Sequence, residues 1–273
     1  MDFVKIKKGK IFFLFLTIFI ILTILLICSR YYNGQDEEQF PKNSYVEING
    51  KRCDFDEFNS FLAGNEYFHE FAFHVEDVKK VLYIGNGNQV GQEIFSTFPN
   101  ARFIRLRKCI IEDARIGVGL QNLRQLDLSK CTIKDGVSFD SESLKVLTLD
   151  FAKVGDIDVN LPRLTSLVVN YNDITEDLIA EFAGCKKIDR ISLIGSDLDS
   201  IEMLEGFNDI SCLRLLKTKT SGYEKLNLFS ELNEIYLDHE VDRSNIDFMY
   251  GNLKNGDIET RAYFVKKRYG LNE

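Results

Sequence analysis

Histidine is the side chain most often used for metal binding and proton transfer near neutral pH, and this chain has three of them. The stretch HEFAFH, residues 69–74, is close to the zinc-binding form H-E-x-x-H, in which two imidazoles lie one helical turn apart. Here His69 and His74 are five positions apart, which directs them to different faces of a helix. His239 follows Asp238, but nothing marks a serine as a nucleophile beside them. We therefore predict core or surface roles for the histidines, with no metal site and no catalytic triad.

A glycine-rich turn is the second candidate for chemistry. In VLYIGNGNQVG, residues 81–91, an apolar run ends in Gly85, Gly87 and Gly91, which is how a dinucleotide-binding unit begins. The spacing is one residue too long for that motif, and the next apolar strand begins about 23 residues on. A strand-helix-strand crossover needs roughly 30 residues or more. The stretch therefore predicts no cofactor site.

The same stretch opens a pattern that recurs along the chain. Three apolar residues in the form L-x-x-L-x-L return at steps of 20 to 24 residues. The eight triplets begin at Val78, Ala101, Leu123, Leu144, Leu164, Ile188, Ile210 and Leu232. Each triplet places two apolar side chains on one face of a short strand, and one strand cannot bury that face alone. The pattern predicts short strands that stack in parallel over a shared core.

Position nine of each unit completes the pattern. It holds Asn86, Cys109, Cys131, Ala152, Asn172, Ser196, Thr218 and Glu240. With LTSLVVNYNDI (164–174) and LRQLDLSKCTI (123–133) as the closest matches, residues 78–242 resemble the leucine-rich repeat family. The resemblance implies an α/β solenoid with parallel strands on its concave face. It also implies that the position-nine side chain bonds the backbone of neighbouring coils.

The cysteines do not form a framework of their own. No C-x-x-C occurs, and the five cysteines after Cys28 are an odd number. We interpret Cys109 and Cys131 as buried thiols of adjacent repeats. Since adjacent strands lie about 4.8 Å apart, a disulfide between them stays open.

The amino terminus indicates a membrane anchor. Residues 11–29 contain an uncharged apolar run of 18 residues, Ile11 to Cys28, which is long enough to cross a bilayer. Lysines precede the run and Asp36, Glu37 and Glu38 follow it, so the N-terminus is expected in the cytoplasm and the repeats on the extracytoplasmic side. A cleaved signal stays open as the alternative. The complete division is a basic tail at 1–10, one transmembrane helix at 11–29, a polar tether at 30–44, an N-terminal cap at 45–77, repeats at 78–242 and a C-terminal cap at 243–273.

Within the N-terminal cap, Asn49-Gly50 predicts a small hairpin. Residues 54 to about 70 are expected to be helical, with Asp54 or Asp56 as the N-cap, and to cover the first coil.

The concave face is the expected binding surface, because repeat solenoids present extended concave surfaces to their partners. Its basic residues concentrate in coils two to four, although the chain has a formal charge of −8, which argues against a nucleic-acid partner. The residues that we expect to bind a partner are Arg102, Phe103, Arg105, Arg107, Lys108, Arg124, Lys130, Tyr171, Arg214 and Tyr236.

The sequence thus predicts a membrane-anchored recognition module that binds an acidic protein or peptide and catalyses no reaction. One alternative is a structural scaffold that organises a membrane-associated assembly. Another, with less support, is an enzyme whose residues lie in the caps.

Overall fold

The computed structural model describes residues 43–64, 68, 74–207, 209–232 and 234–236. The basic tail, the expected transmembrane helix, nearly all of the tether and the C-terminal cap lie outside these residues, as do His69 and His239. Among the residues described, no helix is both long and apolar enough to cross a membrane.

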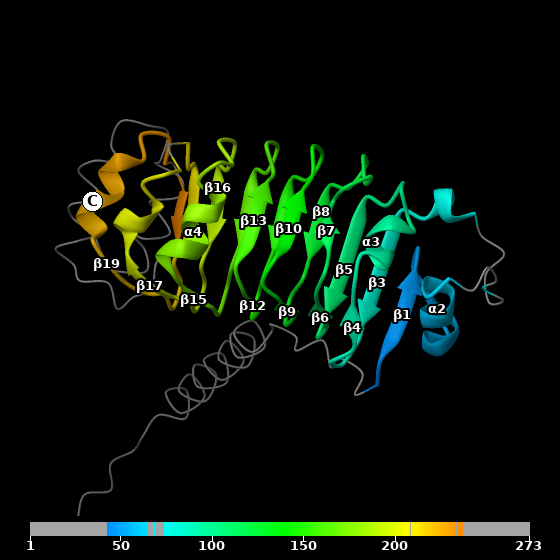
Figure 1. Ribbon diagram of the computed structural model, residues 1–273. Helices are drawn as coiled ribbons and strands as arrows, with labels where there is room; N and C mark the ends of the chain where they lie inside the picture. Colours follow the sequence, from blue (N-terminus) through cyan, green and yellow to red (C-terminus); the bar gives the residue numbers. More distant parts are fainter. Residues whose placement is uncertain (1–42, 65–67, 69–73, 208, 233, 237–273) are drawn as a thin grey trace, which may run out of the picture. The chain divides into compact units, whose positions relative to one another are not determined.

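One sheet of ten strands, here called sheet A, runs along the whole described chain, and eight of its strands are the predicted repeat strands. Each of the eight is parallel to its neighbours among the repeat strands (Figure 1). They are β3 (Lys80–Ile84), β5 (Phe103–Arg107), β8 (Gln125–Asp127), β11 (Val146–Thr148), β14 (Ser166–Val168), β16 (Arg190–Ser192), β18 (Cys212–Arg214) and β20 (Glu234–Tyr236). The predicted stack of parallel strands is confirmed.

The register of sheet A aligns equivalent residues of successive repeats. Leu126 pairs with Leu147, Leu147 with Leu167, and Leu167 with Ile191. These side chains are 0–1% exposed. Because side chains alternate along a strand, positions four and six face the core, while positions three, five and seven form the opposite, outer face of sheet A.

Short strands carry the chain back from sheet A in each coil. One set is β4 (Gln89–Val90), β6 (Ile110–Ile111), β9 (Thr132–Ile133) and β12 (Lys153–Val154), and a second is β15 (Asp173–Ile174), β17 (Asp197–Ser200) and β19 (Lys219–Ser221). A third set, β7 (Arg115–Ile116), β10 (Val137–Asp140) and β13 (Ile157–Asn160), forms another parallel sheet. The remaining coils use α3 (Glu93–Ser96), α4 (Glu176–Phe182), η2 (Ile201–Leu204) and η3 (Tyr223–Leu228).

The glycine stretch at 81–91 is therefore the turn out of the first repeat strand. The chain passes from β3 through β4 and the four-residue α3 to the neighbouring β5. This path lacks the long crossover helix of a dinucleotide-binding unit.

The start of the described chain closes one end of sheet A. β1 (Tyr45–Ile48) and β2 (Lys51–Cys53) form the expected hairpin, whose turn residues Asn49 and Gly50 have φ of 49° and 91°. β1 also pairs antiparallel with β3, so the antiparallel contacts lie at the sheet's end. α2 (Phe55–Leu62) follows, and Asp54 caps it by accepting a hydrogen bond from the Glu57 N–H at 2.8 Å.

The predicted helix was too long. α2 ends at Leu62, and Gly64, with φ of 99°, follows in the left-handed conformation typical of helix ends. Phe58 still covers the first coil as expected, because its ring stacks on Phe98 with centroids 6.0 Å apart.

The position-nine side chains tie each coil to the one before it. Asn172 donates to the Leu149 carbonyl at 2.8 Å, Ser196 to Val169 at 2.7 Å, and the Cys131 thiol to Leu106 at 3.3 Å. Thr218 makes the same contact with the Leu193 carbonyl. Each bond gives a hydrogen-bond donor to a backbone carbonyl at the end of a strand, where the regular hydrogen bonds between the strands of sheet A stop. The predicted role of position nine is confirmed at these four residues.

Candidate functional site

The outer face of sheet A brings three of the predicted binding residues together in coil two. Two cations lie over the Phe103 ring, with Lys80 Nζ 5.7 Å and Arg105 Cζ 5.1 Å from its centroid. Arg105 Nε is 2.7 Å from Asp127 Oδ2, and an Arg107 guanidinium nitrogen is 3.4 Å from the same oxygen. Both arginines are therefore directed to a carboxylate of the next coil.

Asp127 is buried and hydrogen-bonded within this cluster. It is 7% exposed, and its second oxygen accepts hydrogen bonds from the backbone N–H and the hydroxyl of Ser129. Removing one partner from such a buried charge pair leaves the other uncompensated, which is costly. The sequence pattern identified the two arginines but missed that Asp127 neutralises part of their charge. The sequence did contain a signal for this ion pair, because Arg105 and Asp127 hold the same position in successive repeats and therefore lie side by side on neighbouring strands.

A polar row continues across coils four to six. Asp150 Oδ1 accepts from the Asn170 N–H at 3.1 Å, and Asn170 Oδ1 accepts from the Ser192 hydroxyl and the Ile194 N–H, both at 2.8 Å. Burial raises the pKa of Asp150 from 3.8 to about 6, and the nearby Asp127 carboxylate acts in the same direction. The hydrogen bond from Asn170 opposes this shift without cancelling it.

Position eight, at the rim of sheet A, has the same unusual backbone in six successive coils. We call these residues the position-eight strip; they are Lys108, Lys130, Phe151, Tyr171, Gly195 and Lys217. Their φ angles are 54°, 61°, 54°, 57°, 69° and 56°. A non-glycine residue in this left-handed region costs about 1–2 kcal/mol, and bulky residues are uncommon there.

Side chains of the strip form a continuous stack. Lys130 Nζ lies 5.3 Å from the centroid of the Phe151 ring. The Phe151 and Tyr171 rings are stacked, with centroids 4.4 Å apart and planes 6° apart. The Tyr171 ring also fills the space beside Gly195, since a β-carbon at Gly195 would be 2.4 Å from two of the ring atoms. Phe151 is nevertheless 43% exposed. The sequence pattern identified Lys108, Lys130 and Tyr171 as separate binding residues and did not predict that they form one row. The available signal was that each directly precedes position nine of its repeat.

The other predicted binding residues do not join these groups. Arg214 lies over the Tyr236 ring at 5.1 Å, and the Tyr236 hydroxyl is 3.2 Å from Glu234, which forms a separate patch in coils seven and eight. Arg102 and Arg124 hold position two and are exposed, and Arg124 donates to the Ser143 carbonyl at 3.1 Å.

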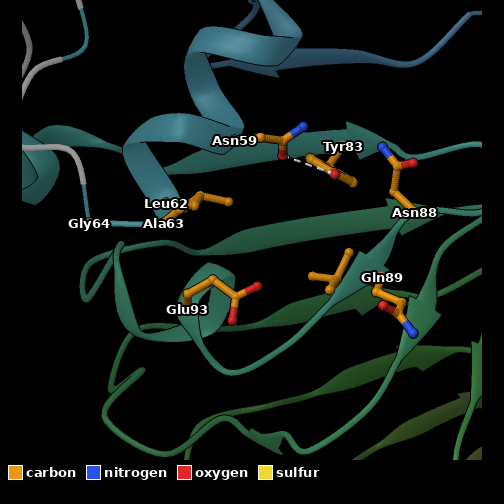
Figure 2. Close-up of a pocket in the computed structure, with 9 residues that line it drawn as sticks. Asn59, Leu62, Ala63, Gly64, Tyr83, Asn88, Gln89 and Glu93 are labelled. Atoms are coloured by element: carbon orange, nitrogen blue, oxygen red, sulfur yellow. Dashed lines mark hydrogen bonds between the residues drawn. The ribbon is translucent and has the colours of Figure 1, made fainter.

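A pocket of about 640 Å³ lies at the N-terminal end of the solenoid, between the end of α2 and the segment from β4 to α3. Figure 2 shows Asn59 and Tyr83 joined by a hydrogen bond beside it, at 3.1 Å. Burial raises the pKa of the Tyr83 phenol to about 12, so the phenol stays protonated and cannot serve as a base near neutral pH. The carboxylate of Glu93, also in the lining, accepts from the Gly91 N–H at 2.8 Å.

The five cysteines within the described ranges are buried free thiols. A hydrogen bond with Cys109, together with burial, raises the pKa of the Cys131 thiol well above its ordinary value. No cluster of three or more His, Cys, Asp or Glu side chains that could hold a metal occurs among the residues described.

No protein-family model matches the sequence, and no curated protein matches it either. Among solved structures, the chain is similar to an internalin (inlF) from Listeria monocytogenes strain 4b F2365, with a TM-score of 0.29 and 11% identity. That similarity covers 74% of this chain and 92% of the internalin chain.

Proposed function

We propose that this chain, a solenoid of the leucine-rich repeat type, is a non-catalytic recognition module that binds a protein or peptide partner on the outer face and rim of sheet A. The observation that carries the proposal is the stack of Lys130, Phe151 and Tyr171, in which Phe151 is 43% exposed. Aromatic side chains are enriched at protein interfaces, tyrosine is among the residues that supply most of the binding energy, and exposed apolar groups gathered together mark such interfaces.

The rigidity of sheet A supports this proposal. Its side chains stand on strands whose core residues are buried and whose rims are held by the position-nine bonds. A surface that is already ordered loses little conformational entropy on binding.

The proposed partner is acidic. Lysines occupy positions 108, 130 and 217 of the rim, Arg214 is exposed in β18, and Arg102 and Arg124 are exposed at the opposite ends of β5 and β8. Asp127 forms ion pairs with Arg105 and Arg107. A positive surface on a chain of net charge −8 steers negatively charged partners towards this side of the molecule.

Membrane attachment through residues 11–29 is part of the same proposal, with the N-terminus in the cytoplasm and the repeats on the other side. It is supported by the uncharged run at 11–28 and by the lysines before it. Protease added to intact cells should degrade the repeats and spare an N-terminal tag. Protection of the repeats would contradict this orientation.

Site-specific photo-crosslinking tests the binding face. A photoreactive phenylalanine is placed at Ser166, on the outer face of sheet A, and separately at exposed Asp158 in β13, which belongs to another sheet. In the full chain expressed in its native membrane, we expect a crosslinked protein partner from Ser166 and none from Asp158. Crosslinks from Asp158 alone would instead favour the scaffold, and none from either position would overturn both ideas.

A further inference from the structure

We infer that the position-eight strip binds an extended acidic peptide segment of the partner that runs across the coils, with apolar residues at its centre and carboxylates at both ends. This inference rests on the proposed function, and it specifies where on sheet A the partner lies and what chemistry it presents.

The backbone strain of the strip is the first support. Glycine or asparagine would adopt the left-handed conformation at position eight with little strain, yet five of the six residues are Lys, Phe or Tyr. Burial in the core does not repay this strain, because Phe151 is 43% exposed and Lys217 is exposed as well. The repeat imposes this backbone, so the choice of Lys, Phe and Tyr at these positions calls for another reason, and strained residues are concentrated at functional sites.

The strip is also held rigidly in register. In coils three to six, the position-eight N–H donates to the position-seven carbonyl of the next coil. Thus Lys130 donates to Asp150 at 2.7 Å, Phe151 to Asn170 at 3.0 Å, and Tyr171 to Ile194 at 2.8 Å. The side chains are therefore presented at fixed intervals of one strand spacing.

The order of chemical types along the strip defines the ligand. Lys108 and Lys130 come first, Phe151 and Tyr171 follow, and Lys217 closes the row. At coils six and seven, half-buried Ile194 and Leu216 at position seven extend the apolar centre. A complementary segment carries acidic residues at its ends and apolar residues between them.

The length of the position-eight strip matches that of a short extended peptide. Five strand spacings of about 4.8 Å separate Lys108 from Lys217, or roughly 24 Å. An extended chain advances about 3.3 Å per residue, so about seven or eight residues span the strip.

The ring contacts favour a peptide over a carbohydrate. Sugars stack on the open face of an aromatic ring, whereas the faces of Phe151 and Tyr171 are covered by Lys130, by each other and by Gly195. The ring edges are what a ligand meets, and aliphatic side chains pack well against them.

The test uses the full chain in detergent and a labelled peptide with two glutamates at each end of a four-residue Leu/Phe centre. Fluorescence anisotropy measures its affinity for the natural chain and for the variant Phe151→Asn/Tyr171→Asn, since asparagine tolerates the left-handed backbone. We expect at least tenfold weaker binding for the variant. The matched control is Leu228→Asn, an exposed apolar residue in η3, which should leave the affinity unchanged.

Three outcomes would overturn the inference. Equal binding of a peptide with lysines at both ends would contradict the charge pattern. Binding to anionic vesicles or heparin, but not to the acidic peptide, would mean another class of ligand. No binding to the peptide would also overturn it.

Photo-crosslinking from Ser166 distinguishes a wrong assignment of the position-eight strip from a wrong proposed function. If Ser166 captures a partner equally well with and without Phe151→Asn/Tyr171→Asn, only the assignment of the strip is wrong. If Ser166 captures nothing in either background, the proposed function itself is wrong.

Discussion

The ring of Tyr171 lies directly over Gly195 of the next coil, and a β-carbon at Gly195 would be 2.4 Å from two of the ring atoms. The single glycine of the position-eight strip is thus the site where a side chain would displace the aromatic stack. Glycine at position 195 therefore allows both the left-handed backbone of the turn and the placement of the Tyr171 ring beside it.

Replacing Gly195 by alanine tests how much of the lost stability comes from backbone strain at positive φ and how much from a steric clash with Tyr171. Gly195→Ala combines a left-handed φ of 69° with the Tyr171 clash, and we expect a loss of about 2–3 kcal/mol in the free energy of unfolding. Gly136→Ala is the matched control, because its φ is 80° and nothing lies within 4 Å of the added methyl. It should cost about 1 kcal/mol. Urea denaturation measures both, and equal losses would show that the ring moves aside freely.

Leu147 tests the shared core. An unpaired carboxylate at this fully buried position of β11 costs several kcal/mol, and adjacent coils depend on one another. We therefore expect Leu147→Asp to abolish the cooperative thermal transition seen by circular dichroism. Ser166→Asp adds the same charge on the outer face of the neighbouring strand and should melt almost as the natural chain does. A normal melt for Leu147→Asp would show that the register is misassigned.

The position-nine bonds predict a smaller effect. Asn172→Ala removes donors from the carbonyls of Leu149 and Asn170, at 2.8 and 3.0 Å, and should cost about 1–3 kcal/mol. Asn160→Ala removes an exposed bond to Asp140 and is expected to cost less than about 0.5 kcal/mol. Chemical denaturation compares the two, and similar losses would contradict a specific role for position nine.

These residues show what the sequence alone can predict. The period of 20 to 24 residues fixes which side chains face the core, so Leu126, Leu147 and Leu167 were placed correctly. The role of position nine was also predictable, because the resemblance to leucine-rich repeats implies that its side chain bonds the backbone of the neighbouring coil.

The chemistry of the outer face was less predictable. Pairing of Arg105 with Asp127 depends on rotamers and on the neighbouring strand, which a repeat pattern does not specify. The left-handed backbone at Phe151 and Tyr171 was hidden, because neither residue favours that conformation by itself. The length of α2 was overestimated, because helical spacing of Phe58, Phe61 and Leu62 gives no stop signal before Gly64.

Asp150 should make stability depend on pH. Its folded pKa of about 6 exceeds the ordinary 3.8, so the folded state binds the proton more tightly than the unfolded state does. The contribution to stability is complete below about pH 3.8 and is lost as the pH rises through about 6. Asp150→Asn should therefore stabilise the protein by about 3 kcal/mol at pH 7.5, with a gain that shrinks towards pH 4.

Thermal melts of the two proteins across this pH range measure the difference. Asp158→Asn, at an exposed carboxylate in β13, should show no such pH-dependent gain. A gain for Asp150→Asn that is equal at every pH would contradict the assigned pKa.

Phe151 provides the sharpest separation of stability from function. Phe151→Asn relieves the left-handed strain, worth about 1 kcal/mol, and loses the Tyr171 stack, worth about 0.5–1.5 kcal/mol. The two effects nearly cancel, so the free energy of unfolding measured in urea should stay within about 1 kcal/mol of that of the natural chain. Binding of the acidic peptide should nevertheless fall, because the exposed edge that meets the ligand is gone. A residue kept only for packing would give the opposite result, with a large loss of stability and an unchanged affinity. Measuring both quantities on one preparation therefore decides whether the fold retains this strained phenylalanine for its own sake or for a ligand.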